Sequence, residues 1–347
     1  MNSIIENINI SSIKQIISPE ILKNRLRIND ELKKQVVNFR NEISDIINKK
    51  NNDKLIVIVG PCSVSNYEST LEYAEELKEI SEHYNNILII MRVYVEKPRT
   101  RTGWKGYLYD PDLNESNDIN KGIELSRKLM LEITRLGLPI ATEFLNLNTP
   151  QYFDDLVSYA CIGARTVESQ LHRELASGLS MPVGFKNTTN GDVSKAIDAI
   201  ITSKSNHTFF GMNTQGNCAI ISTNGNNDGH LILRGSSQSP NYYKEDVKKA
   251  YDLLSNNEIT KGIIIDCSHG NSSKNYKNQI IVAKNIAEQK KNNNNIIGIM
   301  LESFILEGNQ KINHKDVNSI NNMNPNISIT DECIDLDETK IILDLFK

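Results

Sequence analysis

The sequence predicts an α/β protein folded as a (β/α)8 barrel, or TIM barrel, with an N-terminal helical arm and a β-hairpin inserted before the sixth barrel strand. After residue 54, eight short apolar runs alternate with longer segments of helical period. The runs are apolar at consecutive positions, which is typical of parallel strands covered by helices on both faces. The chain of 347 residues suffices for one such barrel. A doubly wound open sheet is the structural alternative.

Residues 1–50 are expected to form an N-terminal extension for oligomer contacts and regulation, and residues 51–347 to form the barrel. Ser18, Pro19 and Glu20 resemble a helix N-cap, a first-turn proline and a first-turn acid. Apolar residues then recur at helical spacing at Leu32, Val36, Phe39, Ile43 and Ile47. The preceding isoleucines would need cover, for which a second subunit is a candidate; they are Ile4, Ile5, Ile8, Ile10 and Ile13.

The eight strand candidates are short and rich in β-branched residues. They are residues 54–60, 88 onward, 139–144, 161–166, 182–187, 230–235, 262–269 and 296–303. Between most of them lies a helical segment long enough for a crossover between parallel strands. Two further apolar runs, 207–212 and 217–225, have no helix between them, so we expect a hairpin at about 207–226.

Composition excludes several classes of protein. The formal net charge of −4 argues against a nucleic-acid partner. No apolar run approaches the length of a membrane span, and the first residues lack a basic region followed by an apolar one, so we expect a cytoplasmic protein. The five cysteines include no CxxC pair, and their odd number argues against a disulfide framework.

Charged residues close nearly every predicted strand. Barrel enzymes build their active sites at the carboxyl ends of the strands, so these residues indicate a catalytic rim. The basic members would repel one another unless anions bind between them; they are Arg92, Lys97, Arg99, Arg165, Lys186 and Arg234. We therefore expect small substrates with several negative charges, phosphorylated ones above all.

A second set of rim residues has the chemistry of a metal site. Cys62, His269 and Glu302 follow or end predicted strands, and Asp331 is the best candidate for a further acid. A thiolate, an imidazole and carboxylates together suit a divalent transition metal. Because the spacing matches no local metal motif, tertiary structure would have to assemble the ligands. Asp331 would have to fold back over the barrel mouth.

Several longer motifs resemble one enzyme family, the class I 3-deoxy-D-arabino-heptulosonate 7-phosphate (DAHP) synthases of the shikimate pathway. The similarity extends from about Ile17 to the C-terminus. Its motifs are GPCSV, RVYVEKPRTRTGWKG, IGARTVESQLHRELASGLSMPVGFKN, HLILRG, DCSHGNSSK, ESFILEGNQ and SITDEC. The resemblance implies a metal-dependent (β/α)8 barrel that condenses phosphoenolpyruvate with erythrose 4-phosphate and releases inorganic phosphate (EC 2.5.1.54).

The resemblance also implies a role for each rim residue. The implied metal ligands are Cys62, His269, Glu302 and Asp331; manganese or iron is preferred, with cobalt or zinc as alternatives. Phosphoenolpyruvate would be bound by Arg92, Lys97, Arg165, Lys186 and Arg234 with Glu143 nearby, and the aldose phosphate by Arg99 and Thr100. Lys97, together with Cys62 and His269, is counted as catalytic. Lys97 would donate a proton to the forming alkoxide if neighbouring cations lower its pKa, or would serve only as an electrostatic clamp.

Regulated members of this family bind an aromatic amino acid away from the active site. The positions that match that pocket are Pro150, Gln151, Leu179, Ser180 and Phe209. Feedback inhibition is therefore expected, in a homodimer or homotetramer. The alternative is that the hairpin only builds the oligomer interface and that Ser180 is an ordinary cap or turn residue.

Three other functions compete with this interpretation. A 3-deoxy-octulosonate 8-phosphate synthase would run the same condensation on a five-carbon aldose phosphate, but the KPRT motif and the N-terminal arm favour the four-carbon substrate. An aldolase that forms a Schiff base on Lys186 would not need a metal. A non-catalytic effector-sensing subunit would not be expected to keep the metal and phosphate motifs intact.

Overall fold

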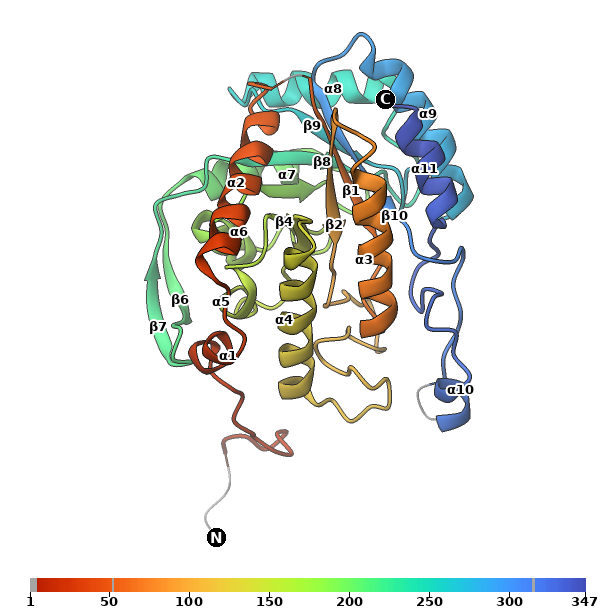
Figure 1. Ribbon diagram of the computed structural model, residues 1–347. Coiled ribbons are helices and arrows are strands. Elements are labelled where there is room, and N and C mark those ends of the chain that lie inside the picture. Colours follow the sequence, from red (N-terminus) through yellow and green to blue (C-terminus); the bar gives the residue numbers. More distant parts are fainter. Residues whose placement is uncertain (1–4, 52, 314–315) are drawn as a thin grey trace.

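The computed structural model describes residues 5–51, 53–313 and 316–347, so that Ile4 of the apolar start lies outside the described residues. Eight parallel strands form a closed barrel in the order β1-β10-β9-β8-β5-β4-β3-β2 (Figure 1). They are β1 (Leu55–Gly60), β2 (Ile87–Arg92), β3 (Ile140–Glu143), β4 (Tyr159–Ile162), β5 (Val183–Lys186), β8 (Gly229–Leu233), β9 (Ile263–Asp266) and β10 (Ile296–Glu302). The predicted (β/α)8 barrel is confirmed, and the doubly wound sheet was the wrong alternative.

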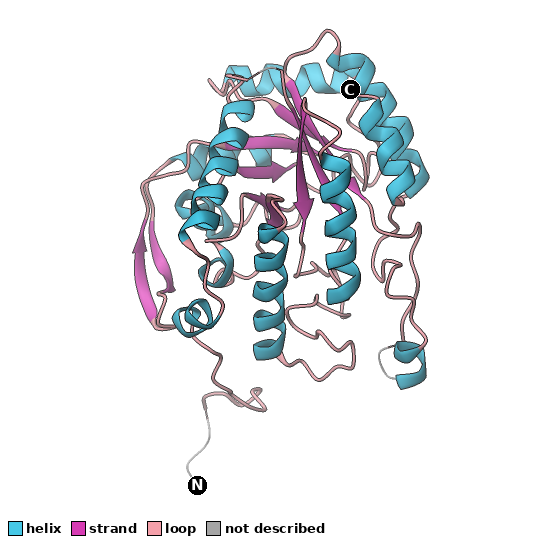
Figure 2. Ribbon diagram, viewed as in Figure 1, coloured by secondary structure: helices cyan, strands magenta, loops and turns pink. Residues whose placement is uncertain are grey.

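Helices and loops surround the barrel. Figure 2 distinguishes them by colour from the strands. The helices outside the arm are α3 (Tyr67–Ser81), α4 (Ile119–Arg135), α5 (Pro150–Phe153), α6 (Gln170–Gly178), α7 (Ser194–Lys204), α8 (Lys244–Asn256), α9 (Gln279–Lys290), α10 (Val317–Asn321) and α11 (Leu336–Asp344). Local sequence fixes some of their starts. The side chains of Asn66 and Asp118 cap α3 and α4 by accepting hydrogen bonds from the first-turn amides of Ser69 and Lys121.

Each barrel strand is apolar on both faces because it separates two cores. In β1, Ile56 and Ile58 point into the barrel interior, whereas Val57 and Val59 pack outward against the helices. This alternation explains why the strands are continuous apolar runs in the sequence.

The fourth strand begins at Tyr159 and ends at Ile162, earlier than the expected 161–166. Arg165 therefore lies in the loop after the strand.

The N-terminal segment contains α1 (Pro19–Arg25) and α2 (Asp30–Ile47). The last turn of α2 places Ile43, Ile46 and Ile47 in the same apolar cluster as the barrel interior, and the amide of Gly262 donates a hydrogen bond to the Ile47 carbonyl at 3.0 Å. The helix thus covers the amino-terminal end of the barrel. Sequence periodicity indicated the helix but could not show which surface it covers.

Between α7 and β8 the chain forms an antiparallel hairpin of β6 (Thr208–Met212) and β7 (Cys218–Ser222), which projects beside the barrel in Figure 1. Its outward-facing pair is apolar: Phe210 lies opposite Ile220, and both are exposed. The arm passes close to the hairpin, since the amide of Glu20 donates to the Thr214 carbonyl at 2.8 Å.

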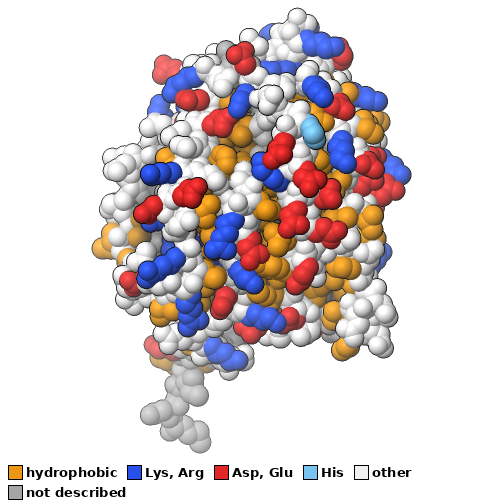
Figure 3. Space-filling view, viewed as in Figure 1, with side chains coloured by type: hydrophobic (Ala, Val, Ile, Leu, Met, Phe, Trp, Pro, Cys, Tyr) orange, Lys and Arg blue, Asp and Glu red, His pale blue; other side chains and the backbone are white. Residues whose placement is uncertain are grey.

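On the face of the molecule shown in Figure 3, basic and acidic side chains are mixed. Within the described residues, no helix is long and apolar enough to cross a membrane.

A buried arginine fastens the arm to the barrel. The guanidinium of Arg127 donates to the Leu26 carbonyl at 3.0 and 3.1 Å and to the carboxylate of Asp155 at 2.7 and 2.8 Å. Replacing Arg127 with methionine is expected to cost about 2 kcal/mol of unfolding free energy, because buried acceptors would lose their donor. Amide hydrogen exchange should also quicken over residues 17–29. Arg135→Met, at an exposed position on the same helix, is the control; equal exchange in both variants would contradict the prediction.

Candidate active site

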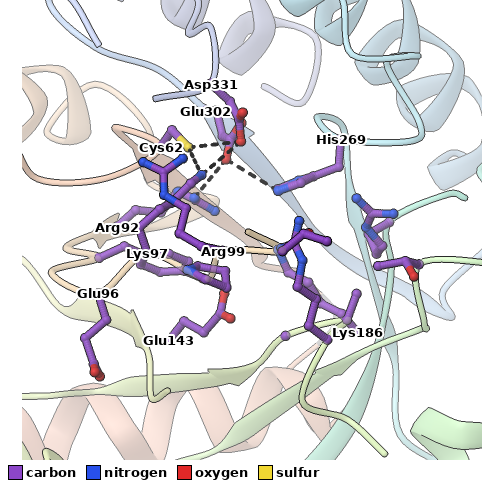
Figure 4. A pocket seen from close by; sticks show the side chains of 18 of the residues that line it. Cys62, Arg92, Glu96, Lys97, Arg99, Glu143, Lys186, His269, Glu302 and Asp331 are labelled. Carbon is purple, nitrogen blue, oxygen red and sulfur yellow. Dashed lines mark hydrogen bonds and ion pairs between the residues drawn. The ribbon is translucent and has the colours of Figure 1, made fainter. Parts of the chain in front are cut away.

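A cavity of about 370 Å³ opens at the carboxyl ends of the barrel strands. All of the residues predicted as metal ligands, substrate contacts or catalytic groups line it: Cys62, Arg92, Lys97, Arg99, Thr100, Glu143, Arg165, Lys186, Arg234, His269, Glu302 and Asp331. Figure 4 shows how their side chains converge from different strands and loops. The structure therefore brings the predicted set together, while the role of each member stays a prediction.

The thiol and two carboxylates of the predicted metal set form one cluster. Cys62, Glu302 and Asp331 each offer a ligand atom, and these atoms lie within 4.8 Å of one another. His269 stands beside this cluster, with Nε2 3.6 Å from Oε1 of Glu302. Sulfur, carboxylate oxygen and imidazole nitrogen suit a divalent transition metal, so the donor set fits such an ion.

The seam between the first and last barrel strands explains how two of these residues meet. Gly60 at the end of β1 pairs with Glu302 at the end of β10, and Cys62 follows two residues after Gly60. Asp331 arrives from the C-terminal segment, as predicted from its position after the last strand. That segment is fixed by a bridge between Ser303 and Ile334, and by a hydrogen bond of 2.8 Å between Ser63 Oγ and Thr330 Oγ1.

Lys97 is the cation nearest to this cluster. Its ammonium lies 2.8 Å from Cys62 Sγ and 2.9 Å from Asp331 Oδ2. Burial disfavours the charged form of Lys97, but the neighbouring Cys62, Asp331 and Glu302 outweigh burial and raise its pKa. The condition set for proton donation, a pKa of Lys97 lowered by neighbouring cations, is therefore not met, because acidic groups lie closest. Burial and the charge of Glu302 raise the pKa of the Cys62 thiol to about 12, so a thiolate ligand would need an added cation.

Two ion pairs anchor the basic wall of the cavity. Arg92 Nη2 lies 3.1 Å from Glu302 Oε1, and Lys186 Nζ lies 2.9 Å from Asp266 Oδ2. All four side chains are almost completely buried. Arg92 Nη1 is buried and has no hydrogen-bond partner among the described residues, so it can still donate to an anion. The pairing of Lys186 argues against the Schiff-base alternative, which needs a neutral amine.

Glu143 and Arg99 are held by close local packing. Gly163 leaves room for the Glu143 carboxylate, since a Cβ at this glycine would stand 2.2 Å from Oε1. Arg99 lies in the loop after β2, beyond the end of that strand at Arg92, and its Nε donates to the Trp104 carbonyl at 2.7 Å. The loop after β2 therefore carries Lys97, Arg99 and Thr100 as one segment at the cavity mouth.

The predicted effector residues lie on three neighbouring elements. Pro150 and Gln151 begin α5, Leu179 and Ser180 follow α6, and Phe209 lies on β6. Ser177 and Thr223 share a hydrogen bond of 2.6 Å between their hydroxyl oxygens, which joins the end of α6 to the base of the hairpin. A ring nitrogen of His172, Nε2, lies 2.9 Å from the Leu145 carbonyl and joins α6 to the loop before α5. These contacts link the elements that carry the five positions, and an effector pocket among them stays a proposal.

Sequence reasoning missed Glu96, which also lines the cavity. Its buried carboxylate accepts hydrogen bonds from the amides of Leu145 and Asn146 and from the hydroxyls of Thr149 and Tyr109. Glu96 therefore connects the loop of Lys97 to the loop before α5. One feature of the sequence could have indicated Glu96. It lies beside Lys97 in the VEKPRT motif, as an acid between apolar strand residues and a basic loop.

The stability of the protein should depend on pH through Glu96. Burial raises its pKa from 4.5 to about 7, so the folded chain binds more protons than the unfolded chain between those values. Its stabilising contribution is then full below the unfolded pKa and is lost as pH rises through 7. We expect the difference in unfolding free energy between wild type and Glu96→Gln to change by at most about 3 kcal/mol between pH 5 and 8.

Urea unfolding at several pH values measures this difference. Glu75→Gln, at an exposed glutamate of α3, is the control and should show no such dependence. A constant difference between wild type and Glu96→Gln across this range would refute the assignment.

Comparisons with known proteins agree with this geometry. The family model of the "DAHP synthetase I family" matches residues 27–344. The chain is 43% identical over 341 residues to the Tyr-sensitive phospho-2-dehydro-3-deoxyheptonate aldolase of Escherichia coli (strain K12), covering 98% of this chain and 94% of the relative. It is 41% identical over 337 residues to the Trp-sensitive aldolase of that name from Salmonella typhi, covering 96% of this chain and 94% of the relative.

A solved structure is also similar. The phospho-2-dehydro-3-deoxyheptonate aldolase from Francisella tularensis SCHU S4 superposes with a TM-score of 0.93 at 45% sequence identity, and the match covers 97% of each chain. Identity at this level over nearly the whole length extends the similarity from the fold to the sequence.

Proposed function

The chain belongs to the DAHP synthetase I family, and from this premise we infer that it condenses phosphoenolpyruvate with D-erythrose 4-phosphate and water to give DAHP and inorganic phosphate. The observation that carries the inference is the family match across residues 27–344. The cavity supports it, because basic residues for two phosphorylated substrates surround one thiol and carboxylate cluster. The names of the relatives favour the seven-carbon product over the octulosonate alternative.

We assign the substrate contacts from the position of each side chain. Arg92, Lys186, Arg165 and Arg234 line the inner wall and would hold phosphoenolpyruvate through its phosphate and carboxylate, with Glu143 at its edge. Arg99 and Thr100, on the loop after β2, would hold the phosphate of the aldose. This separation would place the reacting carbons of the two substrates between the wall and the loop, in an orientation suited to reaction.

The residues that would hold a divalent metal are Cys62, Glu302 and Asp331, with His269 as the fourth ligand. Such an ion, with manganese or iron preferred to cobalt or zinc, would supply Lewis-acid activation of the aldose carbonyl. Lys97 lies within hydrogen-bond distance of two of these ligands and can deliver a proton to the alkoxide oxygen formed from that carbonyl. To act as this general acid, Lys97 must be protonated before the reaction.

Feedback inhibition by an aromatic amino acid follows from the relatives, which are named for sensitivity to tyrosine or tryptophan. Pro150, Gln151, Leu179, Ser180 and Phe209 are the proposed contacts. Exposed apolar residues on the arm and hairpin, among them Ile13, Phe210 and Ile220, support a homodimer or homotetramer. The proposal includes a cytoplasmic location and no nucleic-acid or membrane partner.

The experiment that tests the function is phosphate release from the two substrates, repeated with EDTA and with each aromatic amino acid. We expect phosphate release, its loss on chelation and its return with Mn²⁺. Failure to release phosphate in the presence of Mn²⁺ would overturn the activity and revive the non-catalytic alternative. Release that persists after chelation would overturn the metal assignment alone.

A further inference from the structure

Asp266 lies at the end of β9, directly below the cavity, and it is completely buried. Although it does not belong to the cavity lining, it contacts two residues that do. Oδ2 of Asp266 lies 2.9 Å from Nζ of Lys186 and 3.0 Å from Nδ1 of His269. A single carboxylate oxygen thus joins a residue of the proposed phosphoenolpyruvate wall to a residue of the proposed metal site.

The hydrogen bonds around Asp266 determine which nitrogen of His269 carries a proton. Oδ1 of Asp266 accepts from the amide of Ser268 at 3.0 Å and from its hydroxyl at 2.5 Å. With its proton directed to Oδ1, the Ser268 hydroxyl can only accept from Nδ1 of His269, which is 2.8 Å away. Both neighbours of Nδ1 are therefore acceptors. Nδ1 therefore carries a proton, and Nε2 lies 3.6 Å from Oε1 of Glu302.

The backbone at Asp266 is fixed as firmly as its side chain. Nδ2 of Asn271 donates to the Asp266 carbonyl at 2.8 Å and to the Leu233 carbonyl at 3.2 Å. His269 has a positive φ of 54°, which is uncommon for a residue with a side chain and requires support from its surroundings. The hydrogen bonds of Asp266 to Ser268 and His269 supply such support within the same turn.

We propose that Asp266 is a positioning residue that couples the metal site to the phosphoenolpyruvate site. This inference rests on the proposed function and deepens it. By accepting from Nδ1, Asp266 orients Nε2 of His269 for the metal; by pairing with Lys186, it holds that ammonium at the substrate wall. Because one oxygen serves both residues, displacement of either changes the hydrogen bond to the other. Occupation of one site then alters the affinity of the other, and the effect is reciprocal.

The test compares wild type with Asp266→Asn, in which no carboxylate accepts from both partners. Mn²⁺ affinity is measured by titration without substrates, and phosphoenolpyruvate affinity by calorimetry with and without Mn²⁺. We expect Mn²⁺ to bind about 10- to 100-fold more weakly, as when other partners of metal-binding histidines are removed. We also expect the factor by which Mn²⁺ changes phosphoenolpyruvate affinity to fall toward one. In Co²⁺-loaded protein the thiolate absorption of Cys62 should persist while the ligand-field bands shift.

Asp228→Asn is the matched control, since Asp228 lies 3.7 Å from the ammonium of Lys261 at the opposite end of the barrel. It should leave both affinities unchanged. Ser268→Ala provides a milder variant in case Asp266→Asn does not fold. It removes one hydrogen bond to Asp266 and should weaken Mn²⁺ binding about fivefold.

Unchanged Mn²⁺ affinity in a folded Asp266→Asn, or in Ser268→Ala if the first variant is unfolded, would overturn the inference. A coupling factor equal to that of wild type would overturn it too. Neither binding measurement requires turnover. Wild-type protein that binds both ligands but releases no phosphate would therefore overturn the proposed function and leave the positioning role of Asp266 standing.

Discussion

Replacing Cys62 with alanine is expected to lower the rate of phosphate release by roughly 10²- to 10⁴-fold, because Lewis-acid activation is worth several kcal/mol. The variant removes the only thiol from the cluster formed with Glu302 and Asp331 among the described residues. Steady-state kinetics at saturating Mn²⁺, together with Mn²⁺ titration, measures the effect. Added metal should restore little of the lost activity, because the remaining ligands include no thiolate.

Cys161→Ala is the control for this experiment. Cys161 is also a buried cysteine, but it lies on β4 and accepts a hydrogen bond from Tyr94 at 3.1 Å, outside the metal cluster. It should retain Mn²⁺ affinity and most of the activity. Activity of Cys62→Ala within a few-fold of this control would show that the thiol is not a ligand in the working enzyme.

Arg92→Met is expected to destabilise the fold by about 3–5 kcal/mol, because it leaves the Glu302 carboxylate buried without its partner. The side chains of Arg92 and Glu302 are only 1% and 3% exposed. Urea unfolding monitored by circular dichroism gives the change in unfolding free energy. Phosphoenolpyruvate affinity should fall as well, since Arg92 lines the cavity and its Nη1 has no hydrogen-bond partner among the described residues.

Two comparisons isolate the cause of this destabilisation. Adding Glu302→Gln to Arg92→Met should recover part of the lost stability, because the unpaired charge is removed. Lys33→Met breaks an exposed ion pair with Asp30 and should cost less than about 1 kcal/mol. A cost that small for Arg92→Met would mean that Glu302 finds another partner or takes up a proton.

Much of the barrel could be predicted because its strands have a simple chemical pattern. Runs such as residues 55–59 are apolar at every position, and polar residues follow such runs at the rim. The fourth strand was placed too late, because the predicted segment, residues 161–166, begins two residues after Tyr159 and continues past Ile162, where the strand ends. Periodicity alone did not show where the hydrogen-bonded pairing stops.

The site residues were identified by charge and motif, but their partners required coordinates. The sequence places Asp266 at the end of a strand and could not show that its oxygen reaches both Lys186 and His269, which are 80 residues and three residues away. Glu96 was missed for a similar reason. Three of its four donors, Leu145, Asn146 and Thr149, lie about 50 positions later, and no local sequence pattern predicts a contact at that distance.

The pairing of β1 with β10 places Cys62 and Glu302 on the line where the barrel closes. On the ribosome, the amino-terminal strand is made first and must wait for nearly the whole polypeptide before its partner emerges. A cation bound there would link a segment that is synthesised early to one that is synthesised late. It would also raise the thermal stability of the folded form, by an amount that grows with the logarithm of its free concentration above the dissociation constant. Cells starved of that cation would then hold less of the mature protein as well as a less active one.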